Sequence, residues 1–365
     1  MPKWGYVFIV FIVIGIIATA VTFLVIRANP VPETRRAGTT APVATGPASI
    51  FVSEDGGATW SALSGSEGLT PLVLTFKAGQ LAKTSDNAYL YVGTKGAGLW
   101  IRKSGNSALE RIHDPSNVLR DDADVYSLAQ TITGNDLYLG ILQNQRGRLV
   151  RMTESTAEEI FTTILERYPV LAVYVDPQDP LHINIAAEGA FLEARDGGRS
   201  KSWETLARVR DGIVKFAASD VDGKLWALDT KQTLFVTTVG GRIWREQPQI
   251  VIEEKRTNRI SDMQYHRERG SLIIAADEGL AETYDDGETW SVFRTLVPSG
   301  SLPITAVGVH PRLPEVMWMA AGHFIYRSDD GGITWRSSEL PSKYTVRMIA
   351  VDPLNPKYVY AGISE

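Results

Sequence analysis

The sequence predicts an all-β protein, a seven-bladed β-propeller preceded by one N-terminal transmembrane helix. Three observations predict it: an octapeptide that recurs along the chain, a spacing of 42–50 residues between its copies, and a half-repeat at each end. The composition agrees, since 32 Gly, 18 Pro and 9 Trp in 365 residues are typical of a turn-rich, aromatic β protein. The chain has no cysteine, so packing and strand pairing alone must hold it together.

The first element is the predicted membrane anchor, residues 1–27. Residues 5–26 are 22 consecutive uncharged residues, and a helix of that length rises about 33 Å, enough to cross the hydrocarbon core. A cleaved signal peptide is the alternative, because Ala18-Thr19-Ala20 resembles a cleavage site, although a signal's apolar run normally has about 7–15 residues. Basic residues flank the run on both sides, so the charges do not fix its orientation.

The second element, residues 28–48, is predicted to be an extended tether. It is rich in Pro, Thr and Ala and has no apolar period. Residues 1–48 contain four basic and one acidic side chain, a net charge of +3, which leaves −8 for residues 49–365 because the total is −5. An acidic body lacks the basic surface that nucleic acid requires, so no nucleic-acid partner is predicted.

The remaining elements are repeats. Three octapeptides, SEDGGATW, TYDDGETW and SDDGGITW, begin at Ser53, Thr283 and Ser328 and share the pattern Ser/Thr-x-Asp-x-Gly-x-Thr-Trp. Degenerate copies lie between them: ARDGGRSKSW has two extra residues and TTVGGRIW lacks the Asp. The positions equivalent to the initial Ser/Thr are 53, 102, 152, 194, 237, 283 and 328, at intervals of 49, 50, 42, 43, 46 and 45. That period holds four strands and corresponds to one propeller blade.

A proline-bracketed turn between two apolar runs is the second recurring element. Asp176-Pro177, His310-Pro311 and Asp352-Pro353 begin such turns. Proline cannot donate to a central β-ladder, so it marks the hairpin and not the strand. We expect each turn to join the first two strands of a blade.

The two ends of the chain are predicted to build one blade together. The residues from Thr345 onward supply only the first two strands of a blade, TVRMIAVD and KYVYAGIS, and the residues before Ser64 supply only the last two. Joined, they match an internal repeat. The propeller is therefore predicted to span residues 49–365, with 50–62 pairing against 358–364, which removes the free sheet edges.

The octapeptide is the Asp-box, or bacterial neuraminidase repeat, and from about residue 48 the chain resembles that family of propellers. Over the whole domain it is most similar to the photosystem II stability/assembly factor family and its bacterial relatives, which share the blade count, the proline hairpins and the closure between termini. The resemblance implies a non-enzymatic protein, without a cofactor, that helps to assemble membrane complexes. The chain departs from the bacterial pattern because a hydrophobic span replaces a lipid-modified cysteine.

The Asp-box residues are predicted to be structural. In the tight turn between strands three and four, the carboxylate would accept backbone N–H groups, the glycine would adopt a positive φ, and the tryptophan would pack the outer strand. The set is Ser53, Asp55, Gly57, Trp60, Asp196, Trp203, Trp244, Thr283, Asp285, Gly287, Trp290, Ser328, Asp330, Gly332 and Trp335.

No catalytic residue and no metal site are predicted. Sialidases, which carry the same repeat, have a Phe/Tyr-Arg-Ile-Pro segment before the first blade, and the nearest string, Phe293-Arg294-Thr295-Leu296, lies inside a blade. The five histidines lack metal-ligand spacing, and no phosphate-binding loop or nucleophile elbow is present. A cell-surface glycan-binding protein or sialidase-like glycoside hydrolase stays the alternative, since acidic interblade loops could supply a pair of carboxylates.

The candidate binding residues lie on the loops that lead from strand four to the next strand one. In a propeller these loops gather around the central channel. The basic candidates are Arg208, Arg210, Lys255, Arg256, Arg259, Lys343 and Arg347, and an acidic group on another loop comprises Asp121, Asp122 and Asp124. The basic residues would dock an acidic segment of a partner; alternatively, these charges only solubilise the loops.

These features predict a membrane-anchored, non-catalytic propeller that acts as a protein-binding or membrane-complex assembly scaffold. Its partners would be proteins, membrane proteins among them, and a glycan is a further possibility. Because Asp-box propellers act predominantly outside the cytoplasm, the resemblance implies a propeller in the periplasm or on the cell surface. A flexible tether of this length reaches about 25 Å, so the propeller would stay near the bilayer.

Overall fold

The computed structural model describes residues 47–77, 89–103, 108–131, 136–153, 156–209, 211–219, 221–237, 243–252 and 255–364. The chain divides into two compact units, Met1–Thr45 and Gly46–Glu365, and every described residue belongs to the second. The predicted anchor, residues 1–27, and the predicted tether up to residue 46 lie outside the described residues. The described part has no helix with the length and hydropathy needed to span a membrane.

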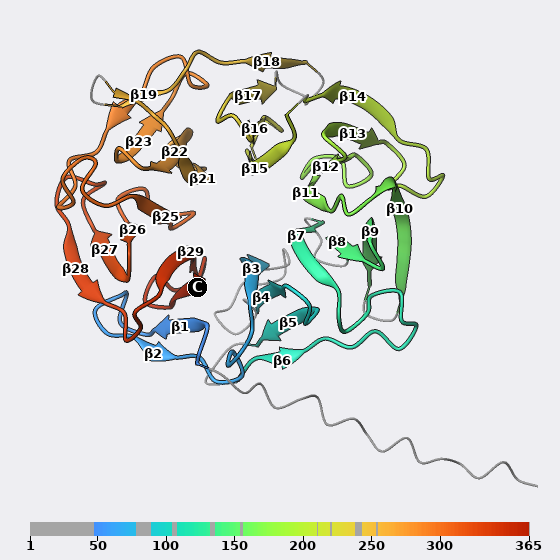
Figure 1. The fold of residues 1–365 in the computed structure, drawn as a ribbon, viewed down its shortest axis with the longest axis horizontal. Helices are drawn as coiled ribbons and strands as arrows, with labels where there is room; N and C mark the ends of the chain where they lie inside the picture. Colours follow the sequence, from blue (N-terminus) through green and yellow to red (C-terminus); the bar gives the residue numbers. More distant parts are fainter. Residues whose placement is uncertain are drawn as a thin grey trace, which may run out of the picture. The chain divides into compact units, whose positions relative to one another are not determined.

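The described residues of the second unit form seven four-stranded antiparallel sheets arranged as the blades of a ring (Figure 1). We number the blades 1 to 7 by their inner strands, which are β3 (Pro71–Lys77), β7 (Asp124–Gln130), β11 (Val170–Val175), β15 (Ile213–Ala218), β21 (Ile260–His266), β25 (Ile304–Val309) and β29 (Thr345–Val351). The second strands are β4 (Tyr89–Thr94), β8 (Leu137–Gln143), β12 (Ile183–Ala187), β16 (Leu225–Asp229), β22 (Ser271–Ala276), β26 (Met317–Ala321) and β30 (Val359–Ser364).

The third and fourth strands complete each blade toward the periphery. The third strands are β5 (Leu99–Arg102), β9 (Arg146–Met152), β13 (Ala190–Ala194), β17 (Leu234–Thr237), β23 (Leu280–Thr283), β27 (Phe324–Ser328) and β1 (Ile50–Ser53). The outer strands are β6 (Glu110–Arg111), β10 (Ala157–Glu166), β14 (Glu204–Arg208), β18 (Trp244–Glu246), β24 (Ser291–Val292), β28 (Arg336–Glu339) and β2 (Ser61–Ala62). A two-stranded hairpin of β19 (Val251–Ile252) and β20 (Lys255–Arg256) lies between blades 4 and 5 in the sequence.

The predicted repeat period is confirmed strand by strand. Each third strand ends at the predicted anchor position: 53, 102, 152, 194, 237, 283 and 328. The proline-bracketed turns lie between first and second strands, as expected, because Asp176 follows β11 and Asp352 follows β29.

The two ends of the described chain meet in blade 7, as predicted. Strand β1 pairs antiparallel with β30, from Ile50 opposite Gly362 to Ser53 opposite Val359. The sheet order β2-β1-β30-β29 therefore combines strands from both ends of the chain. This pairing closes the ring and leaves neither terminal half-blade with an open inner edge.

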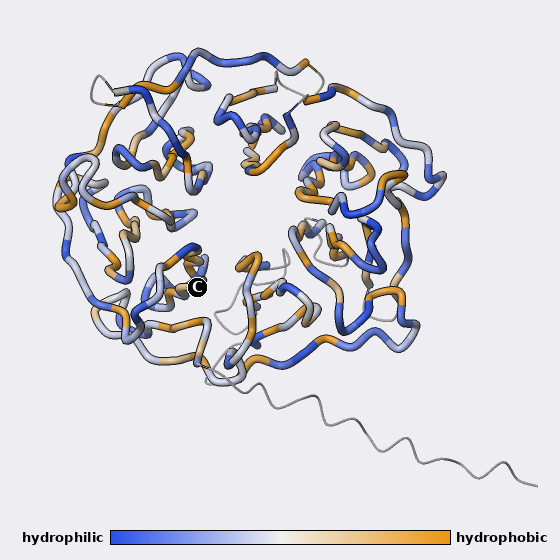
Figure 2. Tube along the Cα trace, in the orientation of Figure 1, coloured by the Kyte–Doolittle hydropathy of each residue, from blue (hydrophilic) through white to orange (hydrophobic). Residues whose placement is uncertain are grey.

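The hydrophobic core lies between adjacent blades. Strands β12, β16, β22 and β26 are buried at every residue, because both faces of each blade pack against a neighbour. One cluster joins Trp318 of blade 6 to Ile349 and Val359 of blade 7. In Figure 2 the inner strands β3, β11 and β15 are orange over much of their length, whereas β21 and β29 carry blue segments.

Candidate channel-mouth binding site

Two connected cavities lie where the inner strands meet. The first has a volume of about 410 Å³ and is lined by the inner strands of blades 1, 2, 3, 4, 5 and 7. The second, about 610 Å³, is lined by the first residues of several inner strands and by Thr230 and Gln232 of the loop between β16 and β17. Leu72, Val214 and Lys215 line both cavities. We call the second cavity the channel mouth, and the side of the ring on which it opens the mouth face.

A β-bulge near the start of every inner strand shapes this site. The pairing of each inner strand with its second strand skips one residue, and these residues are Leu72, Tyr126, Leu171, Val214, Ser261, Thr305 and Arg347. A bulge re-aims side chains and bends the strand. Each of the seven residues lines one or both cavities. One unpaired residue per blade therefore forms a collar around the channel.

The collar is divided into two arcs. In ring order its first four members, from blades 1 to 4, are Leu72, Tyr126, Leu171 and Val214. The next three, from blades 5 to 7, are Ser261, Thr305 and Arg347. An apolar arc thus faces a polar arc that carries one positive charge. Ligand sites commonly combine an apolar wall with a few placed polar groups.

Positive charge concentrates at the channel mouth. Lys215, Arg259 and Arg347 line it together. Within the described residues, neither Arg259 nor Arg347 has an ion-pair partner, so both guanidinium groups can bind an anionic group of a ligand.

Asp262 is the carboxylate of the inner cavity. Its oxygens accept the N–H groups of Met263, at 2.9 Å, and Val307, at 3.1 Å. Burial raises the pKa of the Asp262 carboxyl above its ordinary value, and the charge of Lys215 and the two hydrogen bonds oppose that rise. These bonds hold the carboxylate against blades 5 and 6, on the channel wall.

The structure separates the predicted basic residues into those that line the channel mouth and those that lie elsewhere. Arg259 and Arg347 come together at the channel mouth, but Arg347 belongs to inner strand β29, so its assignment to a loop is wrong. Arg208 ends outer strand β14, and Lys255 and Arg256 form β20, so these three also lie on strands.

Lys343 does not join the mouth either. Its ammonium lies 5.4 Å from the centroid of the Tyr344 ring, and the residue lines a separate cavity with Trp60 and His323. Arg210 lies outside the described residues. The basic arc predicted on the loops is therefore replaced by a smaller cationic group inside the channel.

Each member of the predicted acidic group has a partner close by. Asp121 binds His113 at 3.0 Å and lies 3.7 Å from Arg111. Asp122 pairs with Arg120 at 2.8 Å, and this hydrogen bond lowers the pKa of the Asp122 carboxyl. Asp124 accepts the N–H of Gly96 at 2.7 Å and begins inner strand β7, so its loop assignment is wrong.

Sequence reasoning missed Lys215, Asp262 and the apolar arc of the collar. Each of these residues lies near the start of a first strand, about one blade apart from its neighbour in the set. Aligning the seven first strands on their bulges places the apolar arc in one column and Lys215 and Asp262 in the next, which is the signal that could have revealed the site.

The Asp-box residues lie at the opposite ends of the sheets, in the turns between third and outer strands. In the three intact boxes the anchor hydroxyl accepts the N–H of the glycine at 2.6–2.8 Å, and the carboxylate accepts the N–H of the threonine at 2.8–2.9 Å. The glycines Gly57, Gly287 and Gly332 have φ of 98°, 99° and 90°, which side chains rarely adopt.

The tryptophans of these turns differ in their partners. The indole N–H groups of Trp60, Trp203 and Trp335 donate to the preceding blade, at Ser338, Ile160 and Arg294. Trp290 donates to Gly287 of its own turn, and Trp244 stacks on Phe191 of the preceding blade with ring centroids 3.6 Å apart.

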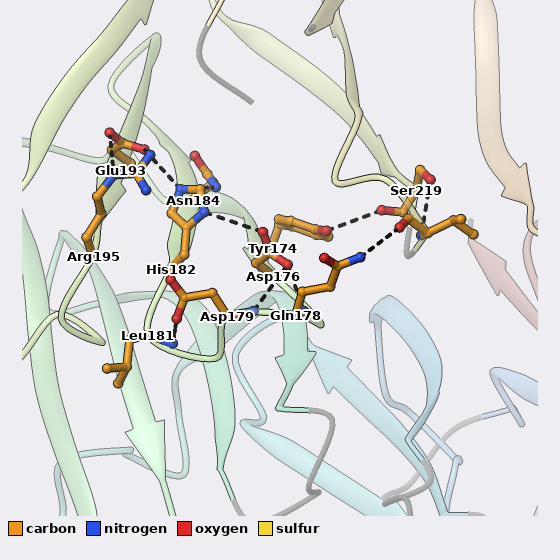
Figure 3. A network of polar contacts seen from close by, with 11 residues as sticks. Tyr174, Asp176, Gln178, Asp179, Leu181, His182, Asn184, Glu193, Arg195 and Ser219 are labelled. Carbon is orange, nitrogen blue, oxygen red and sulfur yellow. Dashed lines mark hydrogen bonds and ion pairs between the residues drawn. The ribbon is translucent and has the colours of Figure 1, made fainter. Parts of the chain in front are cut away.

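A network of titratable side chains lies at the proline-bracketed turn of blade 3. The ring of His182 lies between Glu193, at 2.9 Å, and Asp176, at 3.5 Å (Figure 3). Arg195 binds Glu193 at 3.0 Å, and Tyr174 donates to the carbonyl of Ser219 in blade 4 at 3.2 Å. These groups bind each other and join two blades. In the described part of the chain, no three His, Asp or Glu side chains are placed to hold one metal ion.

Comparison with known proteins identifies the repeat and the fold. The family model of the BNR/Asp-box repeat matches residues 326–337, which contain the third octapeptide. A structure of YCF48 bound to D1 peptide has 15% sequence identity and a TM-score of 0.59, and the match covers 81% of this chain and 93% of that chain. A structure of YCF48 from Cyanidioschyzon merolae has 17% identity and a TM-score of 0.55, over 80% and 96% of the two chains.

No curated protein matches the chain in sequence. The recurring octapeptide is thus an Asp-box, and the chain is a seven-bladed propeller similar in fold to YCF48. At 15–17% identity this likeness is one of fold.

Proposed function

We propose that this chain is a non-catalytic propeller that binds a segment of a protein partner at the channel mouth. The observation that carries the proposal is the meeting of Lys215, Arg259 and Arg347 at the channel mouth, which shares Leu72 and Val214 of the apolar arc with the first cavity. A peptide with a carboxylate and an apolar side chain is complementary to both parts. The YCF48 structure bound to D1 peptide supports the proposal, since it is a propeller of similar fold with a peptide ligand.

The backbone of the channel wall favours a peptide ligand. Each inner strand pairs with a neighbour on one side only, so its other edge faces the channel. Free strand edges offer N–H and C=O groups to an extended peptide. The cavity volumes, 410 and 610 Å³, fall in the range of about 300–1,000 Å³ usual for ligand pockets and accommodate a few residues.

The lining of the cavities does not favour glycoside hydrolysis. That reaction uses two carboxyl groups about 5–10 Å apart on either side of the scissile bond. Among the described residues that line the two cavities, Asp262 is the single carboxylate, and its oxygens are engaged by backbone N–H groups. We therefore rank protein binding above a sialidase-like activity.

We further propose that the propeller is anchored by residues 1–27, lies outside the cytoplasm and assists the assembly of a membrane complex. The uncharged run of 22 residues and the resemblance to assembly factors support this part. Protease added to intact spheroplasts tests it. Digestion in intact spheroplasts is expected, and protection that disappears on lysis would place the propeller in the cytoplasm.

Site-directed photo-crosslinking tests the binding site. The full chain carries benzoylphenylalanine either at Val214, in the channel mouth, or at Ile333, which is 76% exposed in the Asp-box turn of blade 6. We expect a discrete protein adduct from position 214 and none from 333. The double variant Arg259→Glu and Arg347→Glu should abolish the adduct, whereas Arg336→Glu, on outer strand β28, should not. Equal adducts at both positions, or an adduct that survives the double variant, would overturn the proposal.

A further inference from the structure

The proline-bracketed turn of blade 6 differs from those of blades 3 and 7 in one acceptor. In blades 3 and 7 the carboxylates of Asp176 and Asp352 accept the N–H of the residue two positions on, at 2.8 Å in both. In blade 6 the acceptor is an imidazole, because Nδ1 of His310 accepts the N–H of Arg312 at 3.2 Å. A ring nitrogen that accepts a hydrogen bond carries no proton, so this turn requires neutral His310.

A second buried histidine lies at the corresponding end of blade 5. His266 ends inner strand β21, where blades 3, 6 and 7 have Val175, Val309 and Val351. It is 0% exposed, and neither ring nitrogen has a hydrogen-bond partner in another described residue. His310 is 3% exposed, and its Nε2 likewise has no partner among the described residues. An imidazolium at either position would therefore be buried without enough hydrogen-bond acceptors, which is costly.

Burial and nearby cations act in the same direction on both rings. Burial lowers the pKa of His266 below its ordinary value, and the charge of Arg269 lowers it further. Burial also lowers the pKa of His310, with further contributions from the charges of Arg312 and of His266 itself. The two histidines are thus close enough to repel each other once both are charged.

Three carboxylates oppose this effect without reversing it. Glu282 acts on His266, but its own partner is Arg269, which it binds at 2.6 Å. The guanidinium of Arg269 also binds the hydroxyl of Tyr284 at 3.2 Å. Glu268 and Glu315 are exposed, so water and salt screen their charges. Among the described groups that act on the two rings, none is a buried carboxylate free to accept a hydrogen bond from a charged imidazole.

Blade 3 shows the opposite arrangement. There the ring of His182 lies 2.9 Å from Glu193 and 3.5 Å from Asp176. Carboxylates on two sides of the ring can accept the N–H groups of its charged form, so protonation need not disturb this turn. Blade 3 therefore provides an internal comparison, a buried histidine that has acceptors for its protons.

The turn of blade 6 also holds neighbouring parts of the ring together. The guanidinium of Arg269, in blade 5, donates to the carbonyl of Pro314 at 3.2 Å. The N–H of Gly331, in the Asp-box turn of blade 6, donates to the carbonyl of Glu315 at 2.9 Å. Residues 310–316 are therefore bonded both to blade 5 and to the Asp-box turn, and a change in their position affects both.

We propose that His266 and His310 form an acid-sensitive latch, which keeps residues 310–316 against blade 5 at neutral pH and releases them in mild acid. Protonation removes the acceptor of the Arg312 N–H and places two like charges in the core. Histidine is the side chain whose charge ordinarily changes between about pH 5 and 8. The latch lies on the side of the ring opposite the mouth face, so the inference does not depend on the proposed function.

Hydrogen–deuterium exchange of the purified full chain at pH 7.5 and pH 5.5, corrected for the intrinsic exchange rate, tests the latch. A histidine that is neutral in the closed latch and titrates near its ordinary value of about 6.5 in the open one raises the opening constant about tenfold over this range. Its stabilising effect is full above the open-state value and is lost as pH falls below it.

We expect the opening constant of residues 310–317 to rise by about tenfold for each of the two histidines, and so by up to about 100-fold. Residues 176–182 of blade 3 should change little, because His182 has its carboxylate acceptors. An equal rise in both turns, or no rise in either, would overturn the proposal.

Two substitutions should remove the acid response. His310→Asn keeps an oxygen acceptor for the Arg312 N–H but does not titrate, and His266→Val introduces the residue of the other blades. The double variant should stay closed at both pH values. The control His323→Asn removes a histidine that is 33% exposed and pairs with Glu339, and it should keep the full response. A double variant that opens in acid as much as the unaltered chain would contradict the latch.

Histidine-selective NMR of the unaltered chain decides the matter if the double variant fails to fold. We expect the signals of His266 and His310 to stay those of neutral imidazoles while residues 310–316 are closed, and to become those of charged imidazoles only as they open. Charged imidazoles in a turn that remains protected from exchange would show that the fold accommodates both protons and that no latch exists.

Discussion

In blade 6 the Asp-box turn is held by a hydroxyl and a carboxylate together, whereas in blade 3 the carboxylate holds the turn without the hydroxyl. In blade 6, Ser328 accepts the N–H of Gly332 at 2.8 Å and donates to Asp330. The carboxylate of Asp330 in turn accepts the N–H groups of Ile333, at 3.1 Å, and Thr334, at 2.8 Å. Every donor at the start of this turn therefore has an acceptor.

Blade 3 has Ala194 at the position of the anchor hydroxyl. There the carboxylate of Asp196 accepts the N–H of Gly198 directly, at 2.9 Å, and the N–H of Ser200 at 2.8 Å. Beside Ala194, the buried Glu193 binds His182 and Arg195 (Figure 3). A degenerate repeat thus folds because its backbone N–H groups find other acceptors. A buried N–H left without an acceptor would destabilise the fold more than the changed residue itself does.

The largest difference between the two turns is expected at the tryptophan. Trp335 is 7% exposed and belongs to the core between blades 5 and 6, whereas Trp203 is half-buried against Phe161. Trp335→Ala should lower the free energy of unfolding by about 3–5 kcal/mol, and Trp203→Ala by less, because a smaller cavity remains. Urea unfolding followed by circular dichroism measures both. Equal losses would contradict the assignment of a deeper core to blade 6.

An intermediate effect is expected from the anchor hydroxyl. Ser328→Ala leaves the buried N–H of Gly332 without its acceptor, so the free energy of unfolding should fall by about 1–3 kcal/mol. The matched control is Ala194→Ser in blade 3, where Asp196 already accepts the glycine N–H. That change should not stabilise the protein, because the added hydroxyl is buried and the glycine N–H is already satisfied. A control that stabilises blade 3 would show that Asp196 does not replace the hydroxyl.

The smallest effect is expected from acid. The side-chain hydrogen bond from Thr334, with further backbone N–H groups, lowers the pKa of Asp330 from 3.8 to about 2. A depressed folded-state pKa stabilises the fold above the unfolded pKa and loses that contribution as pH falls through the folded one. The melting-temperature difference between the unaltered chain and Asp330→Asn should therefore be full above pH 4 and shrink toward pH 2.

Asp196→Asn provides the comparison for this titration. Hydrogen bonds from Ser200 lower the pKa of Asp196 as well, but fewer donors surround it than surround Asp330. Its melting-temperature difference should be smaller at neutral pH. A difference for Asp330→Asn that is constant between pH 6 and pH 2 would show that its carboxylate does not stabilise the turn through its charge.

The repeat period, the blade number and the terminal closure could be predicted because their determinants are local. Within each intact Asp-box, the hydrogen-bonded residues lie two to four positions apart, so the pattern Ser/Thr-x-Asp-x-Gly is visible in eight residues. The half-repeats at the two ends likewise matched one internal repeat, and β1 pairs with β30 as expected. Local chemistry therefore determined where each third strand ends.

The sequence named Arg259 and Arg347 as candidates, but only the tertiary structure decided which basic residues reach the channel mouth. Lys215 and Arg347 come from the inner strands of blades 4 and 7, and Arg259 comes from the loop that leads into the inner strand of blade 5, so they meet only in the closed ring. The bulge that places Arg347 exists in the register between β29 and β30, which no sequence window displays. Conversely, Asp121 and Asp122 looked like free charges in the sequence, but in the structure they pair with Arg111 and Arg120. A site built from one residue per blade has no local signature, since its members become neighbours only when the ring closes.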